Sequence, residues 1–182
     1  MIRPTLSTIW NKTARLSGLL LLFGASLSGP ACSHYQLGTP TKLAFTTLYV
    51  APVENRAMVP QAQALVATEI RDALEKDGRV TVVASPEAAD AVLRVSLVGY
   101  DREVAAANPA DTGLARKFAL NLRASCTLTD RRTGRPYFTK RELQVTKDAY
   151  VDSGQLQAEY QTLPLLATAL ADRVAHTVFD VW

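Results

Sequence analysis

The sequence predicts an α+β fold, a two-layer sandwich in which a mostly antiparallel sheet carries two helices on one face. Segments in which apolar and polar residues alternate follow one another through the second half of the chain. Two segments with apolar residues at spacings of three and four flank them, as in amphipathic helices. The expected order of elements is β-α-β-β-β-β-α, in a single domain over residues 43–182.

The first elements are a strand, a helix and two further strands. Residues 43–53, LAFTTLYVAPV, are rich in β-branched and aromatic side chains and predict a strand that ends near ENR. Pro60 suits the first turn of the helix that follows, and Gly78 is its expected C-cap. Strands are then expected at 80–85 and 91–100. In the second of these, one face holds Leu93, Val95 and Leu97 and the other holds Arg94, Ser96 and Tyr100.

The clearest alternation lies in residues 117–130, KFALNLRASCTLTD, where every second side chain is apolar and the others are polar. Cys126 falls among the apolar positions, so we expect it to be a small hydrophobic core residue. The turn DRRTGRP leads to a fifth strand, YFTKRELQVTKDAY. For the last helix we favour Thr162 as N-cap with Pro164 in the first turn; the alternative is an earlier start with a kink at Pro164.

The expected sheet has one apolar face, which the helices cover, and one polar face. A polar sheet face meets water, a wet partner surface or a ligand, and its candidate partner-facing residues are Arg94, Asn121, Arg123 and Gln144. If the last three strands form a meander, the connection 101–115 and the segment 148–155 lie at the same end of the sheet. Basic residues gather there, either as solvated loop charges or as a local anion site: Arg102, Arg116, Lys117 and Lys147.

The first 31 residues have the pattern of an export signal. Three basic residues precede the apolar stretch 16–27, which as a helix would reach only about 18 Å and is too short to span a bilayer. The small residues before Cys32 resemble the lipobox of bacterial lipoproteins, in which the cysteine is acylated after cleavage. Ordinary secretory cleavage near Ala31 is the alternative. The expected division is a signal peptide at 1–31, an acylated N-terminus and linker at 32–42, and the domain at 43–182.

Charge and motifs exclude several classes of function. The chain has 20 Lys and Arg against 17 Asp and Glu, but three of the bases lie in the leader, so the remainder is neutral and has no global field for nucleic acid. An acylated Cys32 leaves Cys126 without a disulfide partner. Two cysteines and two distant histidines do not make a metal centre. No hydrolase, zinc-protease, P-loop or Rossmann motif is present, so we expect neither an enzyme nor a cofactor.

Several segments in order resemble the LPS-assembly lipoprotein LptE family. They are CSHYQLG after the lipobox, VAPVENRAMVPQAQALVATEIRDALEKDGRVTVV, ADAVLRVSLVGYDREV, TLTDRRTGRPYF and the closing helix that ends in DVW. The resemblance implies a non-enzymatic lipoprotein in the inner leaflet of the outer membrane. It also implies that the protein plugs the β-barrel LptD and helps lipopolysaccharide (LPS) reach the outer leaflet.

The resemblance gives the candidate residues roles. The polar face residues Arg94, Asn121, Arg123 and Gln144 would face the barrel. The basic sheet end with Arg102, Arg116, Lys117 and Lys147 would touch the lipid A phosphates or inner-core acids of LPS. The alternative function is a periplasm-facing lipoprotein that activates a cell-wall synthase or serves a secretion apparatus, and a periplasmic hydrolase is a more distant one.

We predict that Cys32 is the acylated N-terminus of the mature protein. Each buried methylene contributes about 0.8 kcal/mol to membrane binding, so two or three acyl chains anchor a neutral domain without a basic patch. Mass spectrometry of the protein from its own cell envelope should show acyl chains on Cys32, and Ser33 at the next position predicts outer-membrane sorting. An unmodified cysteine or a soluble periplasmic pool would contradict this prediction.

Overall fold

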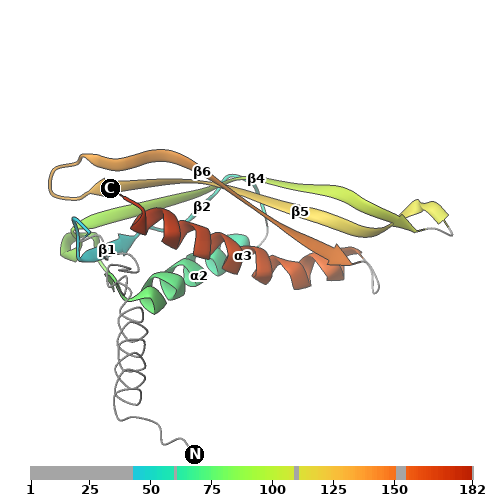
Figure 1. Ribbon diagram of the computed structural model, residues 1–182, viewed down its shortest axis with the longest axis horizontal. Helices are drawn as coiled ribbons and strands as arrows, with labels where there is room; N and C mark the ends of the chain where they lie inside the picture. The colour runs from blue at the N-terminus through green and yellow to red at the C-terminus, as the bar shows by residue number, and fades with distance from the viewer. Residues whose placement is uncertain (1–42, 60, 109–110, 151–154, 182) are drawn as a thin grey trace, which may run out of the picture. The chain divides into compact units, whose positions relative to one another are not determined.

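The computed structural model describes residues 43–59, 61–108, 111–150 and 155–181, which form one mixed sheet and two long helices (Figure 1). The expected α+β sandwich is confirmed. The leader, Cys32, the linker and Pro60 lie outside the described residues. The elements are β1 (Thr47–Val50), β2 (Glu54–Asn55), α2 (Ala62–Asp77), β3 (Thr81–Val83), a 3-10 turn η1 (Pro86–Ala88), β4 (Ala91–Asn108), β5 (Asp111–Asp130), β6 (Pro136–Tyr150) and α3 (Gln155–Phe179).

The sheet has a short parallel part and a long antiparallel part. Its strand order is β3-β1-β4-β5-β6, and β2 pairs with β4 off this path. β1 runs parallel to β3 and β4, whereas β4, β5 and β6 form the expected antiparallel meander. β6 ends opposite Lys117, and β4 and β5 continue beyond it as a two-stranded hairpin (Figure 1).

Two strand boundaries differ from the sequence prediction. Of the expected strand 43–53 only Thr47–Val50 forms a strand, β1, and the short β2 follows beyond its expected end. Pro52, between the two, has no N–H to donate to a ladder. The expected connection 101–115 is for the most part strand, since β4 runs to Asn108 and β5 starts at Asp111.

Both helices cover the same face of the sheet and run side by side in the same direction (Figure 1). Their apolar stripes are buried, and between them Thr168 donates a hydrogen bond of 2.9 Å to Glu69. α2 ends as predicted, with Gly78 at φ 75° and its N–H on the Leu74 carbonyl. The fully buried side chains of the helices include Val66, Ile70, Leu74, Leu166, Leu170, Val174 and Val178.

The start of α3 corrects the prediction that Thr162 is the N-cap. The helix begins at Gln155, and the buried Thr162 hydroxyl donates to the Ala158 carbonyl within it. Pro164 therefore lies inside the helix, where it lacks the N–H that would bond four residues back. The buried Leu166 and Leu170 follow it, so packing against the sheet offsets the lost hydrogen bond.

Cys126 is a core residue, as its alternation predicted. It is a free cysteine with no exposed surface, and burial raises the pKa of its thiol to about 12. A thiol that stays protonated is a poor nucleophile, so Cys126 serves packing alone.

A bulge in β4 moves Tyr100 to the face opposite to the predicted one. The register passes from Leu97 opposite Ala124 to Gly99 opposite Arg123, so Val98 is an extra residue without a partner. Every later side chain of β4 up to Val104 changes face, and Tyr100 packs against the core with the helices. Alternation alone cannot show such an insertion.

One carboxylate joins the start of β1 to the start of β4. Asp90 accepts hydrogen bonds of 3.0 Å each from the Thr46 N–H, the Thr47 N–H and the Thr46 hydroxyl. These bonds favour the ionised form and hold the pKa of Asp90 far below its usual value. The same residue donates its own N–H to Thr47, so the two strand starts are fixed in register.

We predict that Asp90→Asn removes part of the acid dependence of stability. Because the pKa of Asp90 is lowered in the folded state, its contribution is complete above the unfolded pKa, about 3.9, and is lost as the pH falls below that value. Thermal unfolding should give a lower Tm for the variant at pH 7, and the gap to wild type should narrow toward pH 2. The Glu87→Gln variant, an exposed acid in the neighbouring turn, is the control. A gap that stays constant over this pH range would contradict the prediction.

Candidate functional site

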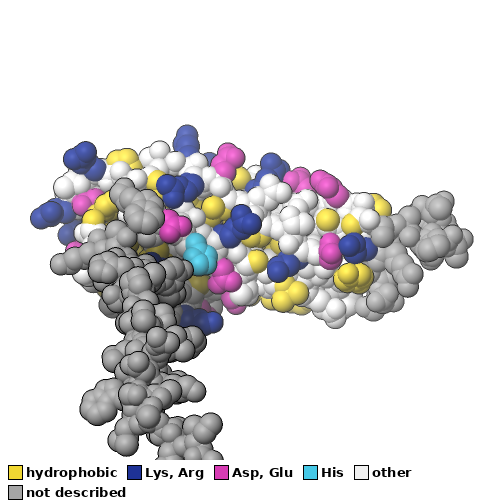
Figure 2. Space-filling model, viewed as in Figure 1, with side chains coloured by type: hydrophobic (Ala, Val, Ile, Leu, Met, Phe, Trp, Pro, Cys, Tyr) yellow, Lys and Arg dark blue, Asp and Glu magenta, His cyan; other side chains and the backbone are white. Residues whose placement is uncertain are grey.

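The sheet face away from the helices is the first candidate site. We call it the open face, and its side chains alternate with the buried ones along the three long strands. Charges of both signs lie interspersed with uncharged side chains over the described surface seen in Figure 2. Before the bulge in β4 and along β5 and β6 the open face includes Arg94, Ser96, Asn121, Arg123, Ser125, Thr127, Glu142, Gln144 and Thr146.

All four candidate partner-facing residues lie on the open face, in different environments. Arg94 and Gln144 are exposed, and Gln144 lies directly opposite Arg123 across β5 and β6. The Arg123 guanidinium donates to Asp101 at 2.8 Å and crosses Gly99, where a side chain would lie 2.6 Å from it. Asn121 is only 9% exposed and accepts a hydrogen bond from Thr146.

The basic residues at the sheet end are divided between the two faces. Arg102 and Lys147 lie on either side of Leu120 in the strand ladder, on the face that the helices cover. Lys117 is on the open face and forms an ion pair of 3.0 Å with Asp148, which raises the pKa of the Lys117 ammonium. Arg116 belongs to β5, but its side chain lies outside the described part of the chain.

Arg102 is held against the first turns of α3. Its guanidinium pairs with Glu159 and lies 5.4 Å from the centre of the Phe118 ring. Tyr100 donates to the same carboxylate, and burial together with the Glu159 charge raises the pKa of Tyr100 to about 12. The bulge in β4 creates this contact, because it turns both Tyr100 and Arg102 toward the helix.

An apolar cleft of about 190 Å³ adjoins this ion pair, and the sequence analysis missed it. Met58 is 87% exposed, Leu156 83% and Tyr160 61%, which is unusual for large apolar side chains. A helix that starts before Leu156 would have indicated the cleft in the sequence. Leu156 and Tyr160 are four residues apart, so within such a helix they lie on one face. The cleft is lined by Ala57, Met58, Val59, Tyr100, Leu156, Glu159, Tyr160 and Leu163.

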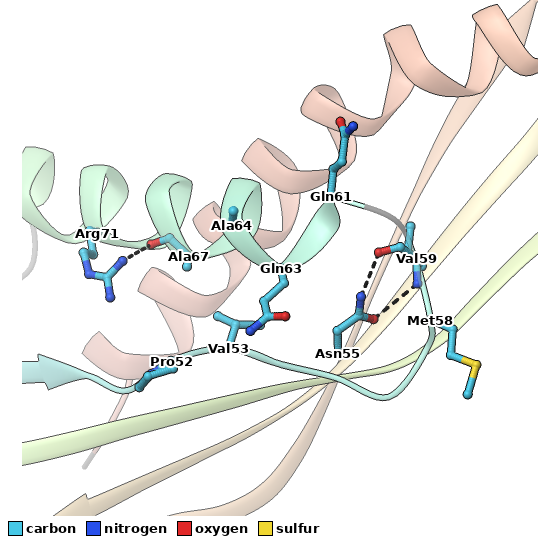
Figure 3. Close-up of a pocket in the computed structure, with 10 residues that line it drawn as sticks. All are labelled: Pro52, Val53, Asn55, Met58, Val59, Gln61, Gln63, Ala64, Ala67 and Arg71. Carbon is cyan, nitrogen blue, oxygen red and sulfur yellow. Dashed lines mark hydrogen bonds between the residues drawn. The ribbon is translucent and has the colours of Figure 1, made fainter.

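A second pocket, of about 560 Å³, lies between the β2 segment and α2 (Figure 3). Asn55 closes the turn beside it, since its side chain donates to the Val59 carbonyl at 2.7 Å and accepts from the Val59 N–H. Arg71 is the one charged residue that lines the pocket, and it donates to the carbonyls of Ala67 and Val50. Asn55 and Arg71 therefore both make hydrogen bonds to the backbone that support the local fold.

Two classes of site are missing from the described residues. No three His, Cys, Asp or Glu side chains among them come close enough to hold a metal ion. None of the described helices combines the length and apolarity needed to cross a membrane.

Comparison with protein-family models gives the family of this chain. The model described as lipopolysaccharide-assembly, LptE, matches residues 45–178. The chain belongs to the LptE family. The match spans the whole described sandwich from Phe45 to Val178, so the open face and the sheet end both lie within LptE-family sequence. Comparison with curated protein sequences gives no match.

Solved structures share the LptE-family fold of this chain at low sequence identity. A Xanthomonas campestris protein is 14% identical with a TM-score of 0.56, and the match covers 77% of this chain and 87% of that one. A minor lipoprotein from Acinetobacter baumannii is 15% identical with a TM-score of 0.51, covering 75% and 94%. Uncharacterized lipoprotein B from Nitrosomonas europaea is 15% identical with a TM-score of 0.50, covering 78% and 84%.

The LptE family is a non-catalytic family of lipopolysaccharide-assembly lipoproteins of the cell envelope, associated with the LPS-transport machinery. This confirms the family resemblance that the sequence segments carried.

Proposed function

We propose that this LptE-family protein is an outer-membrane lipoprotein, anchored on the periplasmic side, that binds and plugs an LptD-type β-barrel and assists LPS insertion into the outer leaflet. The observation that carries the proposal is the open face. A sheet with helices on one side only leaves three long strands with exposed polar side chains, in a chain that belongs to a lipopolysaccharide-assembly family.

The chemistry of the open face suits a barrel interior. The lumen of a transmembrane β-barrel is polar, so a plug needs a polar surface with few large apolar side chains. Ser96, Ser125 and Thr127 supply neutral hydroxyls, and Arg123 is already compensated by Asp101. Such a face offers a polar wall hydroxyl and charged partners, and its unpaired Arg94 and Glu142 need polar or charged partners in the wall, because burying an unpaired charge is costly.

The sheet end offers both parts of an amphiphile-binding surface. Arg102 and Lys147 supply cations on the face that the helices cover, and the cleft with Met58 and Leu156 supplies exposed apolar surface beside Arg102. Lys117 adds a cation on the open face. LPS combines phosphates with acyl chains, so this neighbourhood supports LPS as the ligand. The ion pairs of Arg102 and Lys117 imply that those two cations exchange partners on binding, whereas Lys147 has no ion pair within the described residues.

We predict that the open face contacts the barrel directly. Photo-crosslinkers at Asn121, Arg123 or Gln144 should capture an outer-membrane barrel in cells where the protein is functional, because these positions lie on β5 and β6 away from the helices. The same crosslinker at Asp172, on the exposed side of α3, is the matched control and should not capture it.

Failure of all three open-face positions to capture a barrel would contradict this part of the proposal. Capture of a cell-wall synthase or of a secretion subunit instead would favour the alternative function.

We predict that the double variant Arg116→Ala, Lys147→Ala binds LPS at least tenfold more weakly than wild type. Charge-assisted contacts to phosphate contribute roughly 1.5 to 3 kcal/mol each, and added salt should weaken the wild-type binding as well. The free energy of unfolding should change by no more than about 0.5 kcal/mol, because Lys147 is exposed and surface charges contribute little to stability. Direct binding of LPS to the purified proteins measures the difference.

The control for this measurement is Arg132→Ala, Arg135→Ala, which removes two exposed cations from the turn between β5 and β6 at the other end of the sheet. Equal LPS affinity of wild type and both double variants would show that the basic sheet end is solvated charge without a ligand.

A further inference from the structure

A polar groove of about 650 Å³ crosses the open face near the start of β4, far along the strands from the proposed LPS end. The sheet is its floor, and the segment that carries β2 forms one wall. No part of the proposed function assigns a ligand to it. It is lined by Ala51, Pro52, Glu54, Arg56, Arg94, Val95, Ser96, Val98, Ser125, Thr127, Lys140 and Glu142.

Strand register places three hydrogen-bond donors in one row across the groove. Arg94 of β4 is the ladder partner of Thr127 of β5. On the other side of Thr127, β6 has a bulge: its register passes from Arg141 opposite Cys126 to Phe138 opposite Leu128. Thr139 and Lys140 therefore share the place opposite Thr127, which brings Lys140 into the row.

Lys140 is held in this place by its backbone. Its φ of 46° lies in the left-handed region, which a non-glycine residue adopts at some cost in free energy. The Lys140 N–H donates to the Thr127 hydroxyl oxygen at 3.1 Å. Because that oxygen serves as the acceptor, the Thr127 hydroxyl proton remains available to a ligand.

Arg94 and Lys140 line the groove without an ion pair. On the long strands Arg102, Lys117 and Arg123 each form an ion pair with an acid, and Arg56, which follows β2, pairs with Glu54. Arg94, Lys140, Arg141 and Lys147 form no ion pair within the described part of the chain, and of these four Arg94 and Lys140 line the groove.

Two acids also line the groove, and neither lies in the row of Arg94, Thr127 and Lys140. Glu54 accepts hydrogen bonds from the Ser96 hydroxyl and from Arg56, which lower its pKa, and the Arg56 cation compensates its charge. Glu142 lies one row further along, opposite Ser125. With Arg56 paired to Glu54, the unpaired charges of the groove are two cations and one carboxylate.

We propose that this groove binds a phosphate monoester, with the phosphate between Arg94 and Lys140 and the Thr127 hydroxyl donating to it from the sheet floor. A guanidinium fork, an ammonium and a hydroxyl together offer donors from several directions, which suits a tetrahedral phosphate. Glu142 adds an acceptor one row away, so the ligand carries hydroxyl or amino groups next to its phosphate. A phosphosugar has this chemistry, and so does a lysophosphatidic acid, a lipid phosphate monoester whose glycerol keeps a free hydroxyl.

The test uses the full lipidated chain in a non-ionic detergent, titrated with inorganic phosphate at constant ionic strength. Backbone amide NMR shifts of Thr127 and Lys140 should saturate, whereas chloride at the same ionic strength should leave them unchanged. The double variant Arg94→Gln, Lys140→Gln should bind phosphate at least tenfold more weakly, and Thr127→Val several-fold more weakly.

The variant Arg132→Gln, Arg135→Gln is the matched control, because it removes the same charge from the nearby turn and should keep the wild-type affinity within twofold. Equal weakening in both double variants would mean an adventitious ion only and would overturn the proposal. Thermal unfolding shows whether the Arg94→Gln, Lys140→Gln variant is folded. If that variant is not folded, the Thr127→Val variant decides, because wild-type phosphate affinity in Thr127→Val would also overturn the proposal.

Two further titrations distinguish the sources of the phosphate. Glucose 1-phosphate should bind more tightly than inorganic phosphate if the ligand is a phosphosugar, and 1-hexanoyl lysophosphatidic acid should do so if the ligand is a lipid phosphate. Weaker binding of both esters would overturn the proposal, because the groove would then accept only the free ion. The proposed function also uses Arg94, so it is tested separately. A photo-crosslinker at Gln144 in the Arg94→Gln, Lys140→Gln variant reports whether the protein still contacts the barrel when phosphate binding is lost.

Discussion

The packing of two parallel helices against a single face of the sheet is the constraint on which the rest of the structure depends. The side chains of the long strands alternate, so burying one set against the helices directs the other set outward. Losing a large buried side chain such as Leu120 or Leu170 would cost about 2–5 kcal/mol, and the same energy fixes the register of the open face. Packing of the core therefore fixes the positions of the polar side chains on the open face. Those side chains themselves need contribute little to stability.

Two single-residue insertions then arrange the chemistry on this regular sheet. The bulge at Val98 in β4 turns Tyr100 and Arg102 toward α3 and opens the space in which Arg123 crosses Gly99. The bulge in β6 brings Lys140 beside Thr127. Each insertion changes which charges are neighbours without disturbing the buried positions on either side. Polar surface chemistry can thus vary in this fold while the core stays the same.

The elements with strong periodicity could be predicted from the sequence, and the failures have identifiable physical causes. The alternation of 117–130 and the helix that ends at Gly78 are specified locally, by side-chain burial and by a glycine that adopts positive φ. The strand 101–108 was missed because its part beyond the helices has no buried face to impose alternation. The start of α3 was missed because tertiary packing tolerates Pro164 inside the helix.

For the candidate sites, the sequence predicts which residues share a sheet face only where the alternation is unbroken. The four open-face residues share one face because they follow the alternation, whereas Arg102, Lys117 and Lys147 are divided by a bulge and by strand parity. The apolar cleft with Leu156 depends on the helix start, so it could not be found once that start was placed too late. Lys140 gave no signal in the sequence, because its neighbours are set by one extra residue in the β6 register.

β6 is the outermost strand on its side of the sheet, and this position bears on whether copies of the chain aggregate. An unpaired strand edge is a template on which another chain can add, and β6 is 15 residues long. Its charged residues and the left-handed backbone at Lys140 interrupt the straight row of donors and acceptors that such growth needs. Copies of the chain at high local concentration would otherwise meet edge to edge. The irregularity of β6 thus disfavours their joining into a continuous sheet.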